Sequence, residues 1–220
     1  MTFSDDQGKS FSRDRAILSN VCECCRSNLQ IDSRGNLLLA YRTVPPDGPI
    51  YRDIILASSE NRGNSFTTRV VSHDGWDINA CPVAGPALCV DGSNRVTVIW
   101  FTAGDRPGLY YAESLNSGAS FSPRKLLDAD QTLGKHAQAV ARANGTILVA
   151  WDGVTTEPVV RWGVLDRGSG KIERLGALSG ASYPVVTEAN GGSFVVAALN
   201  AAQHNVAVQT GQLMPNASTR

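Results

Sequence analysis

Residues 59–66, Ser-Glu-Asn-Arg-Gly-Asn-Ser-Phe, decide the fold because their pattern occurs three times in the chain. The pattern is Ser-x-Asp/Asn-x-Gly-x-x-Phe, and residues 4–11 and 114–121 also fit it. The three glycines stand at positions 8, 63 and 118, so the two intervals between them are identical. Self-similarity at a fixed period indicates a protein built from repeated structural units.

Each position of this pattern has a physical role in a tight turn. The Asp or Asn side chain folds onto the backbone two residues ahead, and the glycine supplies a positive φ. The phenylalanine is expected to pack back into the core as an anchor. The pattern therefore predicts a hairpin turn between two strands. Its residues are Ser4, Asp6, Gly8 and Phe11; Ser59, Asn61, Gly63 and Phe66; and Ser114, Asn116, Gly118 and Phe121.

Short β-branched and aromatic runs lie between these turns. Residues 37–42, 96–101, 147–152 and 194–199 align with one another, and a turn rich in Gly, Asn or Asp precedes each. No stretch of the sequence shows a sustained helical period. The chain is therefore predicted to be all-β, a β-propeller of four-stranded antiparallel blades. A β-sandwich would also give short strands, but not an identical turn at a fixed spacing.

The strand count predicts about four blades in a single domain covering residues 1–213. They are expected at residues 21–72, 77–128, 135–178 and 182–212, and the last lacks a fourth strand. We expect residues 12–19 to supply that strand and close the ring, since closure removes exposed edges. Two alternatives stay open: part of a six-bladed sialidase-type propeller, or a homodimer in which two chains close one larger ring. Residues 214–220 are predicted to be a disordered tail.

Composition excludes several classes of partner. The 220 residues include 20 basic and 20 acidic side chains, so general nucleic-acid binding has no electrostatic driving force. Hydrophobic residues make up 42% and charged residues 18%, as in ordinary soluble globular proteins. The sequence has no apolar run long enough to span a membrane. Its first residues do not resemble a signal peptide.

The repeated turns resemble the Asp-box (BNR) repeats of the sialidase-like β-propeller superfamily. Four further segments resemble a bacterial sialidase-like branch that has no settled activity. They are Cys22-Glu23-Cys24-Cys25, Arg52-Asp53-Ile54, His73-Asp74-Gly75-Trp76 and Cys81-Pro82-Val83-Ala84-Gly85-Pro86. The resemblance implies an exported or periplasmic protein.

The innermost strands of a propeller converge on its axis, where a ligand site is expected. We aligned the first strands by their distance to positions 37, 96, 147 and 194. Arg26, Gly85, His136 and Tyr183 then occupy equivalent positions, each at the same interval before its reference. Cys22 falls opposite Cys81 by the same alignment. Two further ligand contacts, His73 and Trp76, are expected in a loop between blades.

The cysteines suggest a second kind of site. On a strand, Cys22 and Cys24 would share a face, and Cys81 would lie on the neighbouring blade. These thiols, with His73 or His136, would suit Zn²⁺ or Cu⁺. Two alternatives stay open: a Cys22–Cys81 disulfide, or free structural thiols. The fifth cysteine, Cys89, is expected to be a small core residue.

The leading functional hypothesis is a non-catalytic binding module that uses the axial face, with a metal ion or a small anion as ligand. Its partner would be a small molecule, a carbohydrate or a protein. The resemblance also implies an alternative, an exo-sialidase with substrate-binding arginines, a tyrosine nucleophile and an aspartate acid/base. The weak candidates for those roles are Tyr41, Arg42, Arg52 and Asp53. A third reading is a structural or protein-interaction propeller without a small-molecule site.

Overall fold

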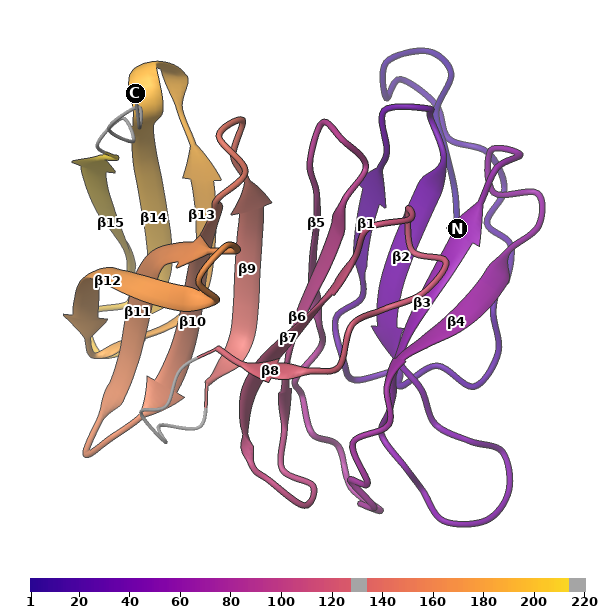
Figure 1. Cartoon of the computed structure of the whole chain (residues 1–220), viewed down its shortest axis with the longest axis horizontal. Helices are drawn as coiled ribbons and strands as arrows, with labels where there is room; N and C mark the ends of the chain where they lie inside the picture. The colour runs from indigo at the N-terminus through magenta and orange to yellow at the C-terminus, as the bar shows by residue number, and fades with distance from the viewer. Residues whose placement is uncertain (128–133, 214–220) are drawn as a thin grey trace.

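Four antiparallel sheets lie side by side in chain order in the computed structural model, which describes residues 1–127 and 134–213 (Figure 1). Within these residues the one helical element is a single 3-10 turn, η1 (Asn190–Gly192). The all-β class and the repeated antiparallel sheets predicted from the sequence are confirmed. The predicted tail, residues 214–220, lies outside the described residues.

Strand bounds follow the repeat. The first sheet contains β1 (Asn28–Ile31), β2 (Leu37–Arg42), β3 (Ile54–Ser59) and β4 (Thr67–Ser72). The second contains β5 (Ala87–Val90), β6 (Val96–Thr102), β7 (Gly108–Ser114) and β8 (Lys125–Leu126). The third contains β9 (Lys135–Ala141), β10 (Ile147–Val154), β11 (Pro158–Asp166) and β12 (Lys171–Ser179). The fourth contains β13 (Ala181–Glu188), β14 (Ser193–Asn200) and β15 (Asn205–Gln212).

The repeated turn forms as predicted, between the third and fourth strands of the first two sheets. In the turn from β3 to β4, the Ser59 Oγ accepts a hydrogen bond from the Gly63 N–H at 2.8 Å. The Asn61 Oδ1 accepts one from the Ser65 N–H at 2.9 Å. Residues 4–10 and 114–120 repeat both bonds, and each glycine has a positive φ.

The phenylalanine anchor is only partly as expected. Phe66 and Phe121 are half-buried against apolar clusters of the first two sheets. Phe11 is 65% exposed, so the prediction that it packs into the core is wrong. The reason is its position, since no complete sheet stands behind the first turn.

Apolar side chains fill the spaces between neighbouring sheets. Trp100 and Trp151 occupy aligned positions on β6 and β10 and are at most 1% exposed. They belong to clusters that join the first sheet to the second and the second to the third. A third cluster, which includes Phe194 and Val196, joins the third sheet to the fourth. The first strands also pack in series, β1 on β5, β5 on β9 and β9 on β13, so these strands form the inner side.

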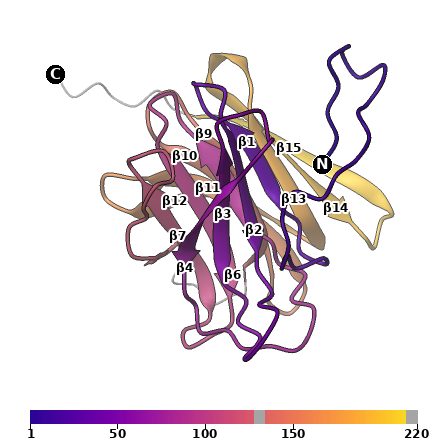
Figure 2. The same cartoon turned by 90° about the vertical axis from the view of Figure 1, so that its right-hand side faces the viewer.

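The predicted ring closure is not formed. The Ser12 N–H donates to the Phe3 carbonyl at 2.8 Å, so residues 12–15 pair with residues 1–3 rather than with β15. The Arg15 guanidinium donates to the Gly63 carbonyl, which places this segment beside the first sheet. Figure 1 shows this hairpin and β15 at opposite ends of the row of sheets, and Figure 2 views the same row from the end at which the first sheet lies.

The physical reason is loop closure. A short local hairpin orders far less chain than pairing between the two ends of the protein. As a result β15 remains an edge strand, with Val206 64% and Val208 55% exposed. Among the described residues, no helix is long and apolar enough to cross a membrane.

Candidate functional site

The inner ends of the sheets bring together Arg26, Gly85, His136 and Tyr183, which we call the axial site. Arg26, Gly85 and His136 line one cavity of about 290 Å³. The His136 and Tyr183 rings lie 4.3 Å apart between their centres, with a tilt of 34°. The equivalent positions inferred from sequence spacing are therefore neighbours in space. Their role in binding a ligand stays a prediction.

His136 is held at both ring nitrogens. Its Nδ1 lies 2.9 Å from the Asp152 Oδ2, and its Nε2 lies 2.8 Å from the Val83 carbonyl oxygen. Both partners are acceptors, so both contacts are hydrogen bonds at once only when both ring nitrogens carry a proton. The same Asp152 carboxylate accepts from the Tyr183 backbone N–H at 2.8 Å. Asp152 therefore positions two axial residues from different sheets.

Backbone strain concentrates at the axial site. Val83, His136 and Tyr183 have φ values of 49°, 43° and 54°, which is uncommon for residues with a Cβ and most costly for a β-branched valine. His136 and Tyr183 also lie where the pairing of β9 with β10 and of β13 with β14 shifts register. Such bulges redirect side chains, and they are over-represented beside functional sites.

Arg26 completes the axial site as an available cation. It is exposed, and within residues 1–127 and 134–213 its guanidinium has no hydrogen bond or ion pair. Gly85 lies so close to the Arg26 backbone that a Cβ at this position would collide with the Arg26 carbonyl. This close approach requires glycine and fixes the first sheet against the second at the cavity.

The disulfide differs from the Cys22–Cys81 pairing that was one of the alternatives, whereas Cys89 is the buried residue expected. The disulfide joins Cys24 to Cys81, and Cys22, Cys25 and Cys89 are free and buried. The expected Cys22–Cys81 bond is wrong because residues 22–25 form a turn rather than a strand. In this turn the Cys25 N–H lies 3.2 Å from the Cys22 carbonyl oxygen, so Cys24 is the one that faces Cys81.

The metal prediction is affected by the same disulfide. The sulfurs of Cys22, Cys24 and Cys25 lie within 4.8 Å of one another, a cluster that could hold a metal ion. With Cys24 bonded to Cys81, the cluster offers only two thiols, whereas protein zinc sites use three or four protein ligands. The donor set therefore does not fit Zn²⁺ while the disulfide is intact.

Two arginines suggested for substrate binding have structural contacts instead. Arg42 is 1% exposed, and its guanidinium donates to the carbonyls of Ala84, Arg52 and Phe101 at 2.9, 2.5 and 2.5 Å. Arg52 is 8% exposed and donates to the carbonyls of Ile78 and Ala80. Both guanidinium groups are thus occupied by backbone carbonyls rather than directed at a common substrate site.

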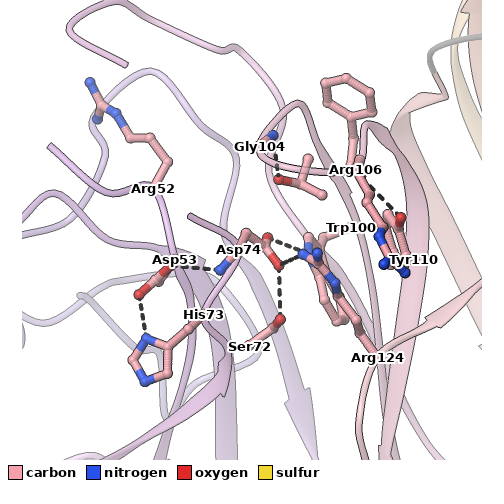
Figure 3. A network of polar contacts seen from close by, with 12 residues as sticks. Arg52, Asp53, Ser72, His73, Asp74, Trp100, Gly104, Arg106, Tyr110 and Arg124 are labelled. Atoms are coloured by element: carbon pink, nitrogen blue, oxygen red, sulfur yellow. Dashed lines mark hydrogen bonds and ion pairs between the residues drawn. The ribbon is translucent and has the colours of Figure 1, made fainter. Parts of the chain in front are cut away.

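The other weak catalytic candidates do not converge on the axial site. Tyr41 is 6% exposed in an apolar cluster of the first sheet, where burial raises the pKa of its hydroxyl. Asp53 and His73 form a pair, with the His73 Nδ1 2.7 Å from the Asp53 Oδ2 (Figure 3). The His73 side chain is 77% exposed, so this pair lies at the surface.

Asp74 is a buried carboxylate that the sequence analysis did not single out. Its Oδ2 accepts from the Trp100 Nε1 at 2.7 Å, and its Oδ1 accepts from the Ser72 hydroxyl and from Arg124 at 2.5 Å (Figure 3). Asp74 thereby ties the end of the first sheet to β6 and to the segment before β8. The only feature of the sequence that could have indicated this role is the position of Asp74 beside His73, in a segment predicted to be a loop.

Trp76 is not the exposed loop contact expected. It is 8% exposed, its ring meets the edge of Phe101 at 5.6 Å, and the Arg42 guanidinium lies 5.0 Å from its centre. It is therefore part of the packing between the first two sheets.

Comparisons with known proteins support the fold alone. No family model matches the sequence, and no curated protein matches it. Similar solved structures include a protein of unknown function from Dyadobacter fermentans, with a TM-score of 0.68, 15% identity and coverage of 90% of this chain. A Hadza microbial sialidase has a TM-score of 0.60, 19% identity and 84% coverage. A NanB sialidase variant from Streptococcus pneumoniae has a TM-score of 0.64, 15% identity and 90% coverage.

The chain spans 58%, 44% and 32% of the lengths of these three structures, in the same order. It has a sialidase-like fold. At these identities the likeness carries no information about the residues of a site.

Proposed function

We propose that this chain is a binding module whose axial site takes a small carboxylate-bearing ligand, with an acidic sugar as the preferred class. The observations that carry the proposal are a cavity lined by Arg26 and His136, the half-exposed Tyr183 ring packed against His136, and the strained backbone of His136 and Tyr183. A planar guanidinium such as that of Arg26 binds a carboxylate through two parallel hydrogen bonds. The Tyr183 ring, 48% exposed, offers a flat apolar surface to a sugar ring.

The polar groups of the axial site favour an anion over a metal ion. Arg26 has no partner among the residues that the structure describes. Both ring nitrogens of His136 face fixed acceptors, so neither nitrogen is available to a metal ion. Asp152 is occupied by His136 and by the Tyr183 N–H. The available group at the cavity is thus a positive one.

The exo-sialidase alternative is less well supported. Its arginine candidates, Arg42 and Arg52, use their guanidinium donors on backbone carbonyls. Its tyrosine candidate, Tyr41, is buried in another part of the first sheet. Turnover of a fluorogenic sialoside by the purified chain would revive this alternative.

The disulfide supports an exported location, since such bonds persist in oxidising compartments.

Titration of the purified protein with N-acetylneuraminic acid, followed by calorimetry, tests the proposal. Lactose serves as the neutral sugar. We expect saturable binding of the acidic sugar, no binding of lactose, and affinity about tenfold weaker in Arg26→Gln, since one charge-assisted contact contributes roughly 1.4 kcal/mol or more.

Arg69→Gln is the matched control, because Arg69 is exposed on β4 and, among the described residues, its side chain bonds only to the neighbouring Thr68 carbonyl. Its affinity should equal that of the wild type. Absence of saturable binding, or equal binding by Arg26→Gln, would reject the axial site and leave the structural or protein-interaction reading.

A further inference from the structure

Four of the five cysteines gather at one point, where a free thiol touches a disulfide. The Cys22 Sγ lies 3.5 Å from the Cys24 Sγ, and Cys24 is bonded to Cys81. The Cys22 Sγ also lies 2.9 Å from the Cys25 Sγ. Cys22 is 2% exposed and Cys81 is exposed, so the group extends from the interior to the surface.

We propose that these cysteines form a thiol–disulfide exchange site, in which Cys22 attacks the Cys24–Cys81 bond and releases Cys81 at the surface. The substrate class is a low-molecular-weight disulfide that the released Cys81 then captures. The proposal concerns a different site from the axial site and does not depend on it.

The first step is internal and balanced. The Cys22 thiolate forms a bond to the Cys24 Sγ, the Cys24–Cys81 bond breaks, and its electron pair leaves on Cys81 as a thiolate. Cys25 can then attack the Cys22 Sγ, and the proton of the Cys25 thiol passes to the departing Cys24 sulfur. This forms a Cys22–Cys25 bond and returns Cys24 to a thiol. One disulfide and two thiols are present before and after.

Capture of the substrate is also balanced. The Cys81 thiolate attacks one sulfur of an external disulfide, RSSR, forming Cys81–S–S–R and expelling RS⁻. Space for the substrate exists, because Cys22, Cys24 and Cys81 line a cavity of about 510 Å³. Cys81 is exposed and can therefore react with an external molecule, whereas the buried thiols cannot.

Turn geometry makes the second pairing feasible. Cys22 and Cys25 are the first and last residues of a turn, as the contact of the Cys25 N–H with the Cys22 carbonyl shows. Such a turn holds the two Cα atoms less than about 7 Å apart, which overlaps the range that a disulfide bridges. The two sulfurs are already in contact.

The positions of the sulfurs assign the first attack to Cys22, whose Sγ lies 3.5 Å from the Cys24 Sγ. Burial, together with the contact to Cys22, raises the pKa of the Cys25 thiol to about 11, so Cys25 keeps its proton. Cys89 provides the contrast, because burial raises its pKa to about 12 and it lies apart from the other sulfurs.

Alkylation of the native protein by iodoacetamide at about pH 8 without reductant, with peptide mapping by mass spectrometry, tests the exchange. We expect label at Cys81 in the wild type, although Cys81 is disulfide-bonded in the resting structure. In Cys22→Ser the rate of labelling at Cys81 should fall about tenfold or more, since the attacking sulfur is gone. Cys25→Ser should retain the label, because Cys25 acts only after Cys81 has been released.

Cys89→Ser is the matched control and should label as the wild type does. Near-ultraviolet circular dichroism checks that each variant is folded. The wild type decides the matter without any variant: if native Cys81 stays unlabelled, the proposal is wrong. Equal labelling of Cys81 in folded Cys22→Ser also overturns it.

A thiol count in denaturant completes the test. The resting structure predicts three thiols. Five thiols with bound zinc or copper would replace the exchange site by a metal centre. A single thiol would show a permanent second disulfide, and both results contradict the proposal.

Discussion

Polar side chains are buried and fully hydrogen-bonded at the boundary between the first and second sheets. At the boundary between the third and fourth sheets, a polar side chain is partly exposed. At the first boundary, Arg42 and Asp74 are each 1% exposed, and each has three hydrogen-bond partners within the protein. At the boundary between the third and fourth sheets, the Asp152 carboxylate contacts the His136 ring and accepts from the Tyr183 backbone N–H, and the Tyr183 side chain is 48% exposed.

The difference teaches how to separate structural from functional polar residues in this fold. A charged group that is buried and fully hydrogen-bonded has no donor or acceptor available for a ligand. Such a group stabilises the contact between sheets instead. The axial site shows the opposite features, which are strained backbone, an unpaired guanidinium and an exposed ring. Strain of this kind costs stability and persists where the surrounding structure imposes it.

The largest effect is expected from Arg42→Leu. Removal of the guanidinium leaves three buried carbonyls without their donor, so the free energy of unfolding should fall by about 3–5 kcal/mol. Urea denaturation measures this loss. Arg69→Leu on exposed β4 is the control and should change stability by less than about 0.5 kcal/mol. A loss below about 1 kcal/mol in Arg42→Leu would contradict the structural role.

Asp74→Asn should cost less, about 2 kcal/mol. The amide oxygen can still accept from the Trp100 Nε1, but the charge that faces Arg124 is lost. Thermal unfolding measures the change. Asp77→Asn is the control, since Asp77 is exposed and its amide can still accept from the Ile50 N–H. Equal melting temperatures for the two variants would refute the assignment of Asp74 as a bond between sheets.

A smaller effect is expected from acid. Burial tends to raise the pKa of the Asp91 carboxyl, but hydrogen bonds from the Arg95 N–H and from Arg167 outweigh it and lower the pKa. A lowered pKa contributes stability above the ordinary value of 3.8, and this contribution is lost as the pH falls through the folded value. Stability should therefore decline from about pH 5 downward.

Urea denaturation at a series of pH values measures this decline. The Asp91→Asn variant lacks the titrating carboxyl, so its stability should be lower at neutral pH and should depend less on acid. An acid dependence as steep as that of the wild type would show that other carboxyls account for the decline.

The smallest effect tests the backbone strain at the axial site, and it has the opposite sign. Val83→Gly should raise the free energy of unfolding by about 0.5–1 kcal/mol, because glycine adopts a φ of 49° without strain. Val154→Gly is the matched control, an exposed valine on β10 without a positive φ, and it should lower stability by a similar amount. Denaturation in urea compares the two, and a loss in both variants would remove the argument for strain at the axial site.

The spacing of residues in the sequence correctly predicted the features that each repeat specifies by itself, which are the turns and the equivalent positions of adjacent units. The turns at residues 59–66 and 114–121 connect the strands expected, and alignment at a constant interval before each reference position places Arg26, His136 and Tyr183 around one point. These results follow because each repeat encodes its own hairpins, and equivalent residues of adjacent units then lie side by side.

Spacing failed where the outcome depended on contacts between units. Strand periodicity was applied to residues 22–25, which form a turn, so the wrong cysteine was paired with Cys81. Trp76 was placed in solvent because its partners, Phe101 and Arg42, come from other strands. Ring closure was inferred from a strand count, which does not include the competing local hairpin at the N-terminus.

By itself the sequence determined the repeated hairpins, because Ser, Asp or Asn, and Gly define each turn through bonds to their own backbone. It also determined which positions are equivalent between units. Tertiary structure alone decided which arginine is buried and which is exposed, which sulfurs meet, and that the N-terminal hairpin does not pair with β15. These properties depend on carbonyls, sulfurs and surfaces supplied by distant segments, and no local pattern of residues specifies them.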